Sequence, residues 1–354
     1  MNGHHSVLRI ACLGLALCAL AAPAQADDFY KGKTVSITVG SSAGGGYDGY
    51  ARFLARSWGK FIPGHPSFVV RNMPGAGSLK ATNYLYNVAA KDGTQIGAIQ
   101  SGILFEPLFK VMGSKQAKFD AMKLNWIGAV VQDQVVMAVW HATPFKSLSD
   151  LKGAPVLSGA SGATTSFAVY PRLMNAAMGT HVQVINGYKS GSAIRLALER
   201  GEVQAMTGWQ YSSLIARKSA WLKEKKVRIL LQFGAKKHPD MPDVPLARDH
   251  ASSPIDRDVL DLITLRQDLG HPFVAPPDLP KDRLATLQKS FWSMVTDSAF
   301  LADAKKHRIE VSPLNAQECA KVIKKGYAAS PEVVAKARAI MISDTKKKSK
   351  KKKM

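Results

Sequence analysis

The chain has 354 residues, of which 46% are hydrophobic, so it is long enough for two domains with separate cores. Its formal net charge is +22, but seven lysines lie in residues 346–353 and one arginine in residues 1–26, which leaves +14 for residues 27–345. A basic body suits an anionic solute as well as ordinary solubility, and a terminal lysine run is typical of a solvated, disordered tail. The charge therefore does not by itself indicate nucleic acid as a partner, and we expect none.

The first 26 residues have the pattern of a secretory signal peptide. Arg9 precedes the apolar run Ile10–Ala22, and Ala24-Gln25-Ala26 is a small-residue cleavage site. The run is too short to span a bilayer. Cleavage before Asp27 predicts an exported, periplasmic protein. It also leaves Cys319 as a single cysteine, so the fold must depend on its core rather than on a disulfide.

The mature chain opens with a strand, a glycine-rich turn and a helix. Hydrophobic residues alternate over residues 35–39, as in a strand, and recur at helical spacing over residues 51–58. The turn between them contains Gly44, Gly45 and Gly46. Such a turn leaves backbone N–H groups pointing outward at the positive end of the helix dipole, an arrangement that holds an anion.

The same pattern follows at once in a second unit. A strand over residues 67–70 leads into the glycine turn of residues 71–78, then into a helix with an apolar stripe over residues 81–88. A third strand over residues 95–100 ends at Ser101. This βαβαβ start predicts a parallel sheet, with ligands bound at the carboxyl ends of its strands.

The apolar run of residues 126–140 is interrupted at Gln132-Asp133-Gln134, so we expect it to cross from one domain to the next. The strand, turn and helix pattern then recurs around the small-residue turn of residues 158–165. Pro171 inside the following apolar stripe should kink or delay that helix. Further strands are expected over residues 182–185, 203–206 and 227–233.

The last third of the chain is predicted to be mainly helical. Amphipathic stripes cover residues 284–295 and 316–323, with Cys319 expected in the core. Ser330-Pro331 combines a cap with a proline at the first helical position and predicts a helix through Met341.

Two motifs in the sequence suggest enzymatic alternatives. Residues 44–49 match the G-x-G-x-x-G dinucleotide fingerprint, but the second strand ends in Val70-Arg71-Asn72, without the acidic residue that the fingerprint needs. Residues 159–163 resemble a nucleophile elbow, so an exported serine hydrolase using Ser161 stays an alternative. The nine histidines form no ligand pattern with cysteine or with one another, so no metal or cofactor is expected.

Several motifs together resemble the extracytoplasmic substrate-binding receptors of tripartite tricarboxylate transporters, also called Bug-type receptors. They recur in order over most of residues 27–342: Gly45-Gly46-Tyr47-Asp48, Val70-Arg71-Asn72-Met73-Pro74-Gly75-Ala76-Gly77, Lys91-Asp92-Gly93-Thr94, Ser161-Gly162-Ala163-Thr164, Gly187-Tyr188-Lys189-Ser190-Gly191-Ser192-Ala193, Gly201-Glu202-Val203 and the segment 271–280.

The resemblance implies an α/β, two-lobed periplasmic-binding-protein type II fold, each lobe being a mainly parallel sheet flanked by helices. We expect residues 27–129 and 232–345 to form lobe 1 and residues 130–231 to form lobe 2, with residues 346–354 as a basic tail. It also implies a monomeric receptor, not an enzyme, that captures a small carboxylate between the lobes and delivers it to the permease subunits. A ligand-binding sensor for a signalling partner is the alternative role.

The resemblance also implies which residues bind the carboxylate, through backbone amides and hydroxyl groups of turns in both lobes. We carry over the following positions: Ser41, Ser42, Gly44, Gly45, Gly46, Tyr47, Asp48, Gly75, Gly77, Ser78 and Ser101 on one lobe, and Ser158, Ser161, Gly162, Ala163, Thr164, Thr165 and Tyr188 on the other. Asp48 is expected to cap the glycine loop or to bind a ligand amine or hydroxyl rather than the carboxylate. Trp209 is added from its residue type, as an aromatic side chain near the turns that is expected to wall the ligand cleft.

Overall fold

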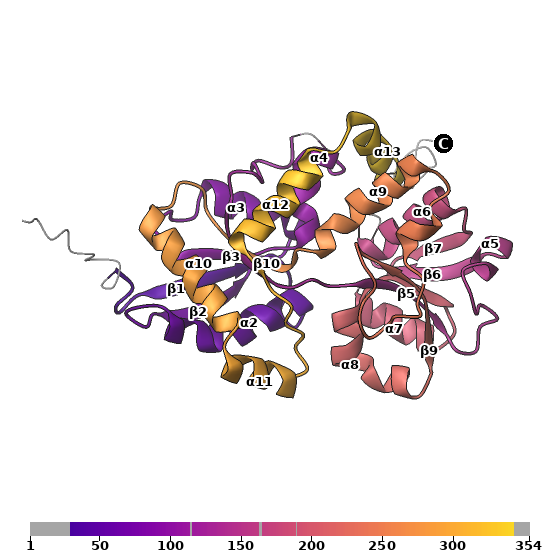
Figure 1. The fold of residues 1–354 in the computed structure, drawn as a ribbon, viewed down its shortest axis with the longest axis horizontal. Coiled ribbons are helices and arrows are strands. Elements are labelled where there is room, and N and C mark those ends of the chain that lie inside the picture. Colours follow the sequence, from indigo (N-terminus) through magenta and orange to yellow (C-terminus); the bar gives the residue numbers. More distant parts are fainter. Residues whose placement is uncertain (1–28, 114, 163–164, 189, 343–354) are drawn as a thin grey trace, which may run out of the picture.

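A computed structural model describes residues 29–113, 115–162, 165–188 and 190–342. The predicted signal peptide, the lysine tail, Ala163, Thr164 and Lys189 lie outside the described residues. The described chain forms two α/β lobes side by side, each built on its own sheet (Figure 1). The expected two-lobed α/β architecture is confirmed.

The first sheet has six strands in the order β11-β4-β10-β3-β1-β2. β1 pairs in parallel with both β2 and β3, which confirms the predicted βαβαβ start, whereas β10 and β11 run antiparallel to their neighbours. The strands are β1 (Thr34–Val39), β2 (Ser67–Asn72), β3 (Gln95–Ala98), β4 (Asn125–Val131), β10 (Gly270–Ala275) and β11 (Leu314–Asn315).

The second sheet has five strands in the order β7-β6-β8-β5-β9. β6 is parallel to β7 and β8, and β5 is antiparallel to β8 and β9. The strands are β5 (Val135–Trp140), β6 (Val156–Ala160), β7 (Val182–Asn186), β8 (Ala205–Gln210) and β9 (Val227–Phe233).

Helices cover both faces of the two sheets (Figure 1). The α-helices are α2 (Gly46–Trp58), α3 (Leu79–Asn87), α4 (Glu106–Phe109), α5 (Asp150–Gly153), α6 (Ser166–Met178), α7 (Gly191–Glu199), α8 (Tyr211–Lys223), α9 (Pro254–Thr264), α10 (Lys281–Val295), α11 (Ser298–Lys306), α12 (Ala316–Tyr327) and α13 (Pro331–Ile342). Short 3-10 turns are η1 (Gly59–Phe61), η2 (Ala76–Ser78), η3 (Ser101–Phe105), η4 (Ala247–His250) and η5 (Leu265–Gln267).

The expected effect of Pro171 is not observed at the start of its helix. α6 begins at Ser166 and continues through Pro171, so the proline does not delay it. Most of α6 is buried, and it packs against β6, β7 and β8. Burial of this apolar helix offsets the loss of one backbone donor.

The chain passes between the lobes at the interrupted run that the sequence indicated. β4 belongs to the first sheet and β5 to the second, and only residues 132–134 separate them. The return runs from β9 through residues 234–269 to β10. Within that return, α9 packs against α6 of the second lobe. Near the end of the described chain, α13 packs against both α6 and α9. The segment assigned from sequence to lobe 1 therefore contacts both lobes, and the lobe boundaries stay a prediction.

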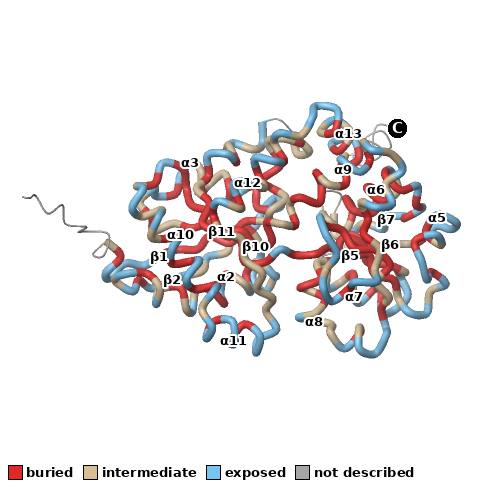
Figure 2. The backbone as a smooth tube through the Cα atoms, viewed as in Figure 1, coloured by how far each residue is buried: buried red, intermediate tan, exposed pale blue. Residues whose placement is uncertain are grey.

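Buried residues concentrate on the two sheets and on the helix faces that pack against them (Figure 2). Cys319 is fully buried on α12, and burial raises the pKa of its thiol to about 12, which confirms the prediction that it belongs to the core. Among the described residues, no helix combines the length and apolar character needed to cross a membrane.

Candidate functional site

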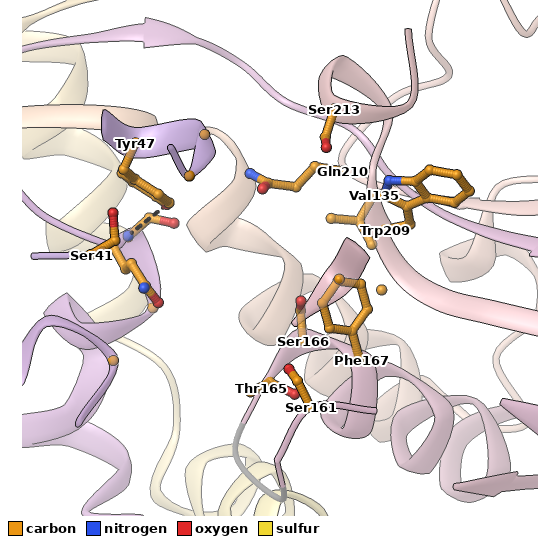
Figure 3. A pocket seen from close by; sticks show the side chains of 18 of the residues that line it. Ser41, Tyr47, Val135, Ser161, Thr165, Ser166, Phe167, Trp209, Gln210 and Ser213 are labelled. Carbon is orange, nitrogen blue, oxygen red and sulfur yellow. Dashed lines mark hydrogen bonds between the residues drawn. The ribbon is translucent and has the colours of Figure 1, made fainter. Parts of the chain in front are cut away.

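A cavity of about 690 Å³ lies between the lobes, where the carboxyl ends of strands from both sheets meet. Its first wall is the loop that follows β1, together with the start of α2. Its second wall is formed by the starts of α6 and α7 and by the end of β8. Figure 3 shows Ser41 and Tyr47 on one side of this cavity and Ser161, Thr165 and Ser166 on the other.

The glycine loop after β1 is fixed by a buried carboxylate. Asp48 is 3% exposed, and its oxygens accept hydrogen bonds from the Gly44 amide at 2.8 Å, from Asn72 Nδ2 at 2.8 Å and from Arg52 Nε at 3.0 Å. Asn72 Nδ2 also donates to the carbonyl of Ser41 at 3.0 Å. These bonds tie the loop to α2 and to the end of β2.

The Asp48 carboxylate is therefore ionised, and its oxygens already accept hydrogen bonds from residues of the chain. Burial alone would raise its pKa, but the hydrogen bonds from Arg52, Gly44 and Asn72 outweigh burial and lower the pKa below its usual value. Its side chain does not line the cavity. Asp48 positions the loop, while the N–H groups of Gly46 and Tyr47 hydrogen-bond to none of the described residues.

The start of α6 offers a second set of donors. Thr165 occupies the N-cap position, but its hydroxyl donates to the carbonyl of Gly162 at 2.8 Å instead of capping the first turn. The N–H groups of Ser166 and Phe167 consequently hydrogen-bond to none of the described residues. Both residues line the cavity. An uncapped helix start of this kind presents N–H donors and a positive dipole end to an anion.

Close packing of β8 against α6 fixes this helix start. Gly208 has φ +80°, and a Cβ at this position would lie only 2.4 Å from the carbonyl oxygen of Ser166. Only glycine permits this approach. The close approach of β8 to α6 places Trp209 and Gln210 in the cavity wall. Figure 3 shows the Gln210 side chain pointing into the cavity in the direction of Tyr47.

Tyr47 closes the cavity on the side of the first lobe. Its hydroxyl accepts a hydrogen bond from the amide of Ser101 at 3.3 Å. Its ring packs edge-on against the His271 ring, with the two ring centroids 4.5 Å apart. Burial raises the pKa of Tyr47. Burial also lowers the pKa of His271 to about 3, so this histidine is neutral and packs as an aromatic ring between Tyr47 and Tyr50.

Three buried polar atoms in the cavity wall have no hydrogen-bond partner among the described residues. They are Ser41 Oγ from the first lobe, Trp209 Nε1 from the second lobe and Arg266 Nη2 from η5 between the lobes. All three can donate a hydrogen bond. Because a buried donor without an acceptor costs about 1 to 3 kcal/mol, three of them around one cavity indicate a ligand rich in acceptors.

Two acidic side chains also line the cavity, and both have partners in the chain. Glu106 Oε1 accepts from the Met112 amide at 2.6 Å, and burial raises its pKa. Asp133 accepts from the Ser212 amide at 3.2 Å and from the Ser212 hydroxyl at 2.7 Å, and burial raises its pKa to about 7. Among the described residues, no group of three or more His, Cys, Asp or Glu side chains is placed to hold a metal ion.

The structure brings most of the predicted site residues to this cavity. Those that line it are Ser41, Ser42, Gly44, Gly45, Gly46, Tyr47, Gly77, Ser101, Ser161, Thr165 and Trp209. Ala163 and Thr164 lie outside the described residues.

The remaining predicted residues support the walls without lining them. Ser78 is fully buried, and its hydroxyl donates to the Gly40 carbonyl and accepts from the Gln100 amide. Ser158 is likewise buried against Thr207. Gly75, Gly162 and Tyr188 also lie outside the cavity lining, as does Asp48.

Several cavity residues were not anticipated from the sequence. The starts of α7 and α8 contribute Ser190, Gly191, Ser192, Arg195, Gln210 and Ser213. The turn before α7 carries the same strand, turn and helix signal as the two predicted anion sites, so that signal could have found it. Arg266 lies on an irregular turn between elements and has no comparable signal in the sequence.

Comparisons with known proteins agree with this architecture. A sequence profile described as "Tripartite tricarboxylate transporter family receptor" matches residues 62–338. Among curated proteins, no sequence matches this chain. The chain is similar in fold to the periplasmic binding protein BugD, with 20% identity, a TM-score of 0.64 and coverage of 88% of this chain and 99% of that chain.

Two further solved structures with the same fold come from Rhodopseudomonas palustris. One is described with adipate; it is 16% identical with a TM-score of 0.63, and covers 87% of this chain and 97% of that chain. The other is MatC with bound malate, 20% identical with a TM-score of 0.59, covering 85% of this chain and 99% of that chain. The expected two-lobed periplasmic-binding-protein fold is thereby confirmed. Because the family profile spans most of the sequence, this chain belongs to the tripartite tricarboxylate transporter receptor family.

Proposed function

We propose that the protein is a periplasmic receptor that captures a small carboxylate, such as a di- or tricarboxylate or a related organic acid, in the cavity between its lobes. It would then deliver this solute to the permease subunits of a tripartite membrane transporter. The observation that carries the proposal is the convergence of donors without acceptors. The uncapped starts of α2 and α6 line one cavity. Ser41, Trp209 and Arg266 line it as well, and each carries a buried polar atom without a hydrogen-bond partner among the described residues.

The donors are sufficient for useful affinity. A hydrogen bond to a charged group contributes about 1.5 to 3 kcal/mol, and micromolar binding needs about 8 kcal/mol after ordering costs. Several amides and hydroxyls from both lobes together meet that requirement. Two R. palustris relatives of the same fold are described with adipate and with malate, which supports a carboxylate as the ligand class.

The hydrolase alternative finds less support. Ser161 lines the cavity, but none of the histidines among the described residues lines it with Ser161. A serine nucleophile needs such a base within hydrogen-bond reach. A fluorophosphonate probe that labels the wild-type protein at Ser161 would revive this alternative.

Calorimetry on the purified mature protein tests the proposal. We expect citrate, malate, succinate or adipate to bind with micromolar affinity, and the uncharged diamide of the bound acid to bind at least 100-fold more weakly. Gly46→Val should abolish binding, because Gly46 lines the cavity and a branched side chain there would occupy space beside the open loop amides. The fold should be retained, since the nearest atom to the added Cβ would be His271 Cε1 at 3.5 Å, an ordinary van der Waals contact.

Gly49→Val is the matched control. Gly49 lies on the same helix, and a Cβ there would meet no atom within 4 Å. This variant should retain the wild-type affinity. Equal binding of carboxylates by Gly46→Val and Gly49→Val would move the site away from the glycine loop, and a wild-type protein that binds none of the acids would refute the proposed function.

A further inference from the structure

Arg266 has an unusual place among the charged side chains of the cavity. It lies on η5, on the return from the second lobe to the first. Its guanidinium carbon is 5.0 Å from the centroid of the Tyr170 ring on α6, and its Nη1 would be 3.3 Å from a Cβ on Gly102 at the start of η3. The cation is therefore held between an element of each lobe.

No group of the described chain neutralises this cation. Among the described residues, no carboxylate lies within ion-pair distance of the Arg266 guanidinium, and its buried Nη2 has no hydrogen-bond partner. The two acids that line the same cavity are engaged elsewhere, Asp133 with Ser212 and Glu106 with Met112. A partly buried cation without a counter-charge is costly, and a bound anion removes that cost.

The cation is separate from the donors of the helix starts. Arg266 packs over Tyr170 in the second turn of α6, whereas the open N–H donors belong to Ser166 and Phe167 in the first turn. If one carboxylate of a ligand binds at the start of α6, Arg266 therefore remains available for a second carboxylate of the same ligand. Arginine suits this role because its planar guanidinium can bind a carboxylate through two parallel hydrogen bonds.

We propose that Arg266 binds the second carboxylate of a dicarboxylate solute and makes the cavity select dicarboxylates over monocarboxylates of the same length. This inference rests on the proposed carboxylate site. It assigns to Arg266 the discrimination between solutes with one carboxylate and solutes with two. It also predicts a preferred distance between the two carboxylates.

The test measures binding of paired acids to the wild-type protein and to Arg266→Gln by calorimetry. The pairs are succinate with butanoate, glutarate with pentanoate, adipate with hexanoate and pimelate with heptanoate. In the wild-type protein we expect one dicarboxylate to bind at least 30-fold more tightly than its monocarboxylate partner. In Arg266→Gln that ratio should fall to below threefold, through weaker dicarboxylate binding with monocarboxylate binding unchanged.

Two further variants separate recognition from folding. Arg266→Lys keeps the positive charge without the planar guanidinium and should recover part of the ratio. Arg257→Gln removes an exposed arginine on α9, paired at 3.5 Å with Asp249, and should leave the ratio unchanged. Without ligand, Arg266→Gln should unfold at the same temperature as the wild type or higher, since it removes an unneutralised cation. A purely structural Arg266 predicts a lower unfolding temperature.

The outcomes distinguish the two proposals. If the wild-type protein binds both members of each pair equally, and Arg266→Gln does the same, the role of Arg266 is refuted while the carboxylate receptor stands. If the wild-type protein binds none of the acids, the proposed function itself fails. A 30-fold ratio that survives in Arg266→Gln would assign the discrimination to another residue and overturn the inference.

Discussion

The starts of α8 and α6 both present first-turn hydrogen-bond donors, but only those of α8 have an acidic partner within the described chain. At α8, the amide and hydroxyl of Ser212 both donate to the carboxylate of Asp133, which belongs to the chain itself. At α6, the hydroxyl of Thr165 turns back to Gly162, and the first-turn amides of Ser166 and Phe167 bond to none of the described residues. The start of α8 is thus filled by an acidic side chain of the chain itself, whereas none of the described residues fills the equivalent position at α6 beside the cavity.

The largest expected effect comes from making α6 resemble α8. Ser166→Glu places a carboxylate of the chain at the first position of α6, where the helix dipole favours it. We expect the affinity for the solute to fall at least 100-fold, about 2.7 kcal/mol, because the open donors are then occupied and the added charge repels an anion. Calorimetry with the tightest-binding carboxylate measures the loss.

Lys281→Glu is the control for this substitution. It also places a glutamate at the first position of a helix, α10, with a larger change of charge, where the side chain is exposed and does not line the cavity. Its affinity for the solute should stay within twofold of the wild type. If Ser166→Glu binds as tightly as Lys281→Glu, the start of α6 does not hold the ligand.

The second prediction concerns Asp133, which accepts hydrogen bonds from Ser212 at the start of α8. Burial raises the pKa of Asp133 to about 7, so between about pH 4 and pH 7 the folded state binds its proton more tightly than the unfolded state does. The unfolding free energy contributed by this group is therefore present at low pH and falls as the pH rises through that window, on the order of 1 kcal/mol per pH unit. Urea unfolding at pH 5, 6 and 7 measures this slope.

Asp133→Asn keeps the shape of the side chain and removes the titration. The difference in unfolding free energy between the wild type and Asp133→Asn should therefore shift by about 2 kcal/mol between pH 5 and pH 7, in favour of the variant. Parallel stability curves for the two proteins over this range would show that Asp133 does not carry the raised pKa.

The smallest expected effect lies near Asp133, at a contact between the return segment 234–269 and the chain before β11. Glu310 hydrogen-bonds to His238 at 3.4 Å and thereby raises the pKa of that histidine. The stabilisation is complete below pH 6.5 and is lost as the pH rises through the raised pKa. Glu310→Gln should lower the unfolding free energy by about 0.5 to 1 kcal/mol at pH 6 and by less at pH 9.

Asp303→Asn provides the comparison for Glu310→Gln. Asp303 contacts His307 at 3.2 Å on the exposed surface of α11, where solvent screens the pair. Its effect on the unfolding free energy should be smaller than that of Glu310→Gln at pH 6. An equal effect of the two substitutions would show that the His238–Glu310 contact adds no more to stability than an exposed pair does.

The regular parts of the fold could be predicted because they follow from local patterns. Alternation over β1 and helical spacing over α2 located the first turn, and the interruption at residues 132–134 located the passage between the sheets. The packing of α9 and α13 against α6 could not be predicted, since it depends on which apolar faces meet in space. No local pattern carries that information.

The same division holds for the candidate site. Ser41, Gly46 and Thr165 were found because strand, turn and helix signals predict exposed amides. For Asp48 the sequence predicts either a cap of the glycine loop or a contact with a ligand amine or hydroxyl. The structure agrees with the first role, because its carboxylate accepts hydrogen bonds from Gly44, Asn72 and Arg52. Arg266 was missed, because its place in the cavity wall depends on Tyr170 and Gly102, residues distant from it in the sequence.

Trp209 gives the molecule a built-in optical reporter. Of the six tryptophans, all of which the structure describes, it is the one that lines the cavity, with its indole nitrogen unbonded in the described chain. Indole emission responds to hydrogen bonding and to nearby charge, so occupancy of the cavity can be followed by intrinsic fluorescence without a label. The other five tryptophans lie outside the cavity wall and supply a constant background.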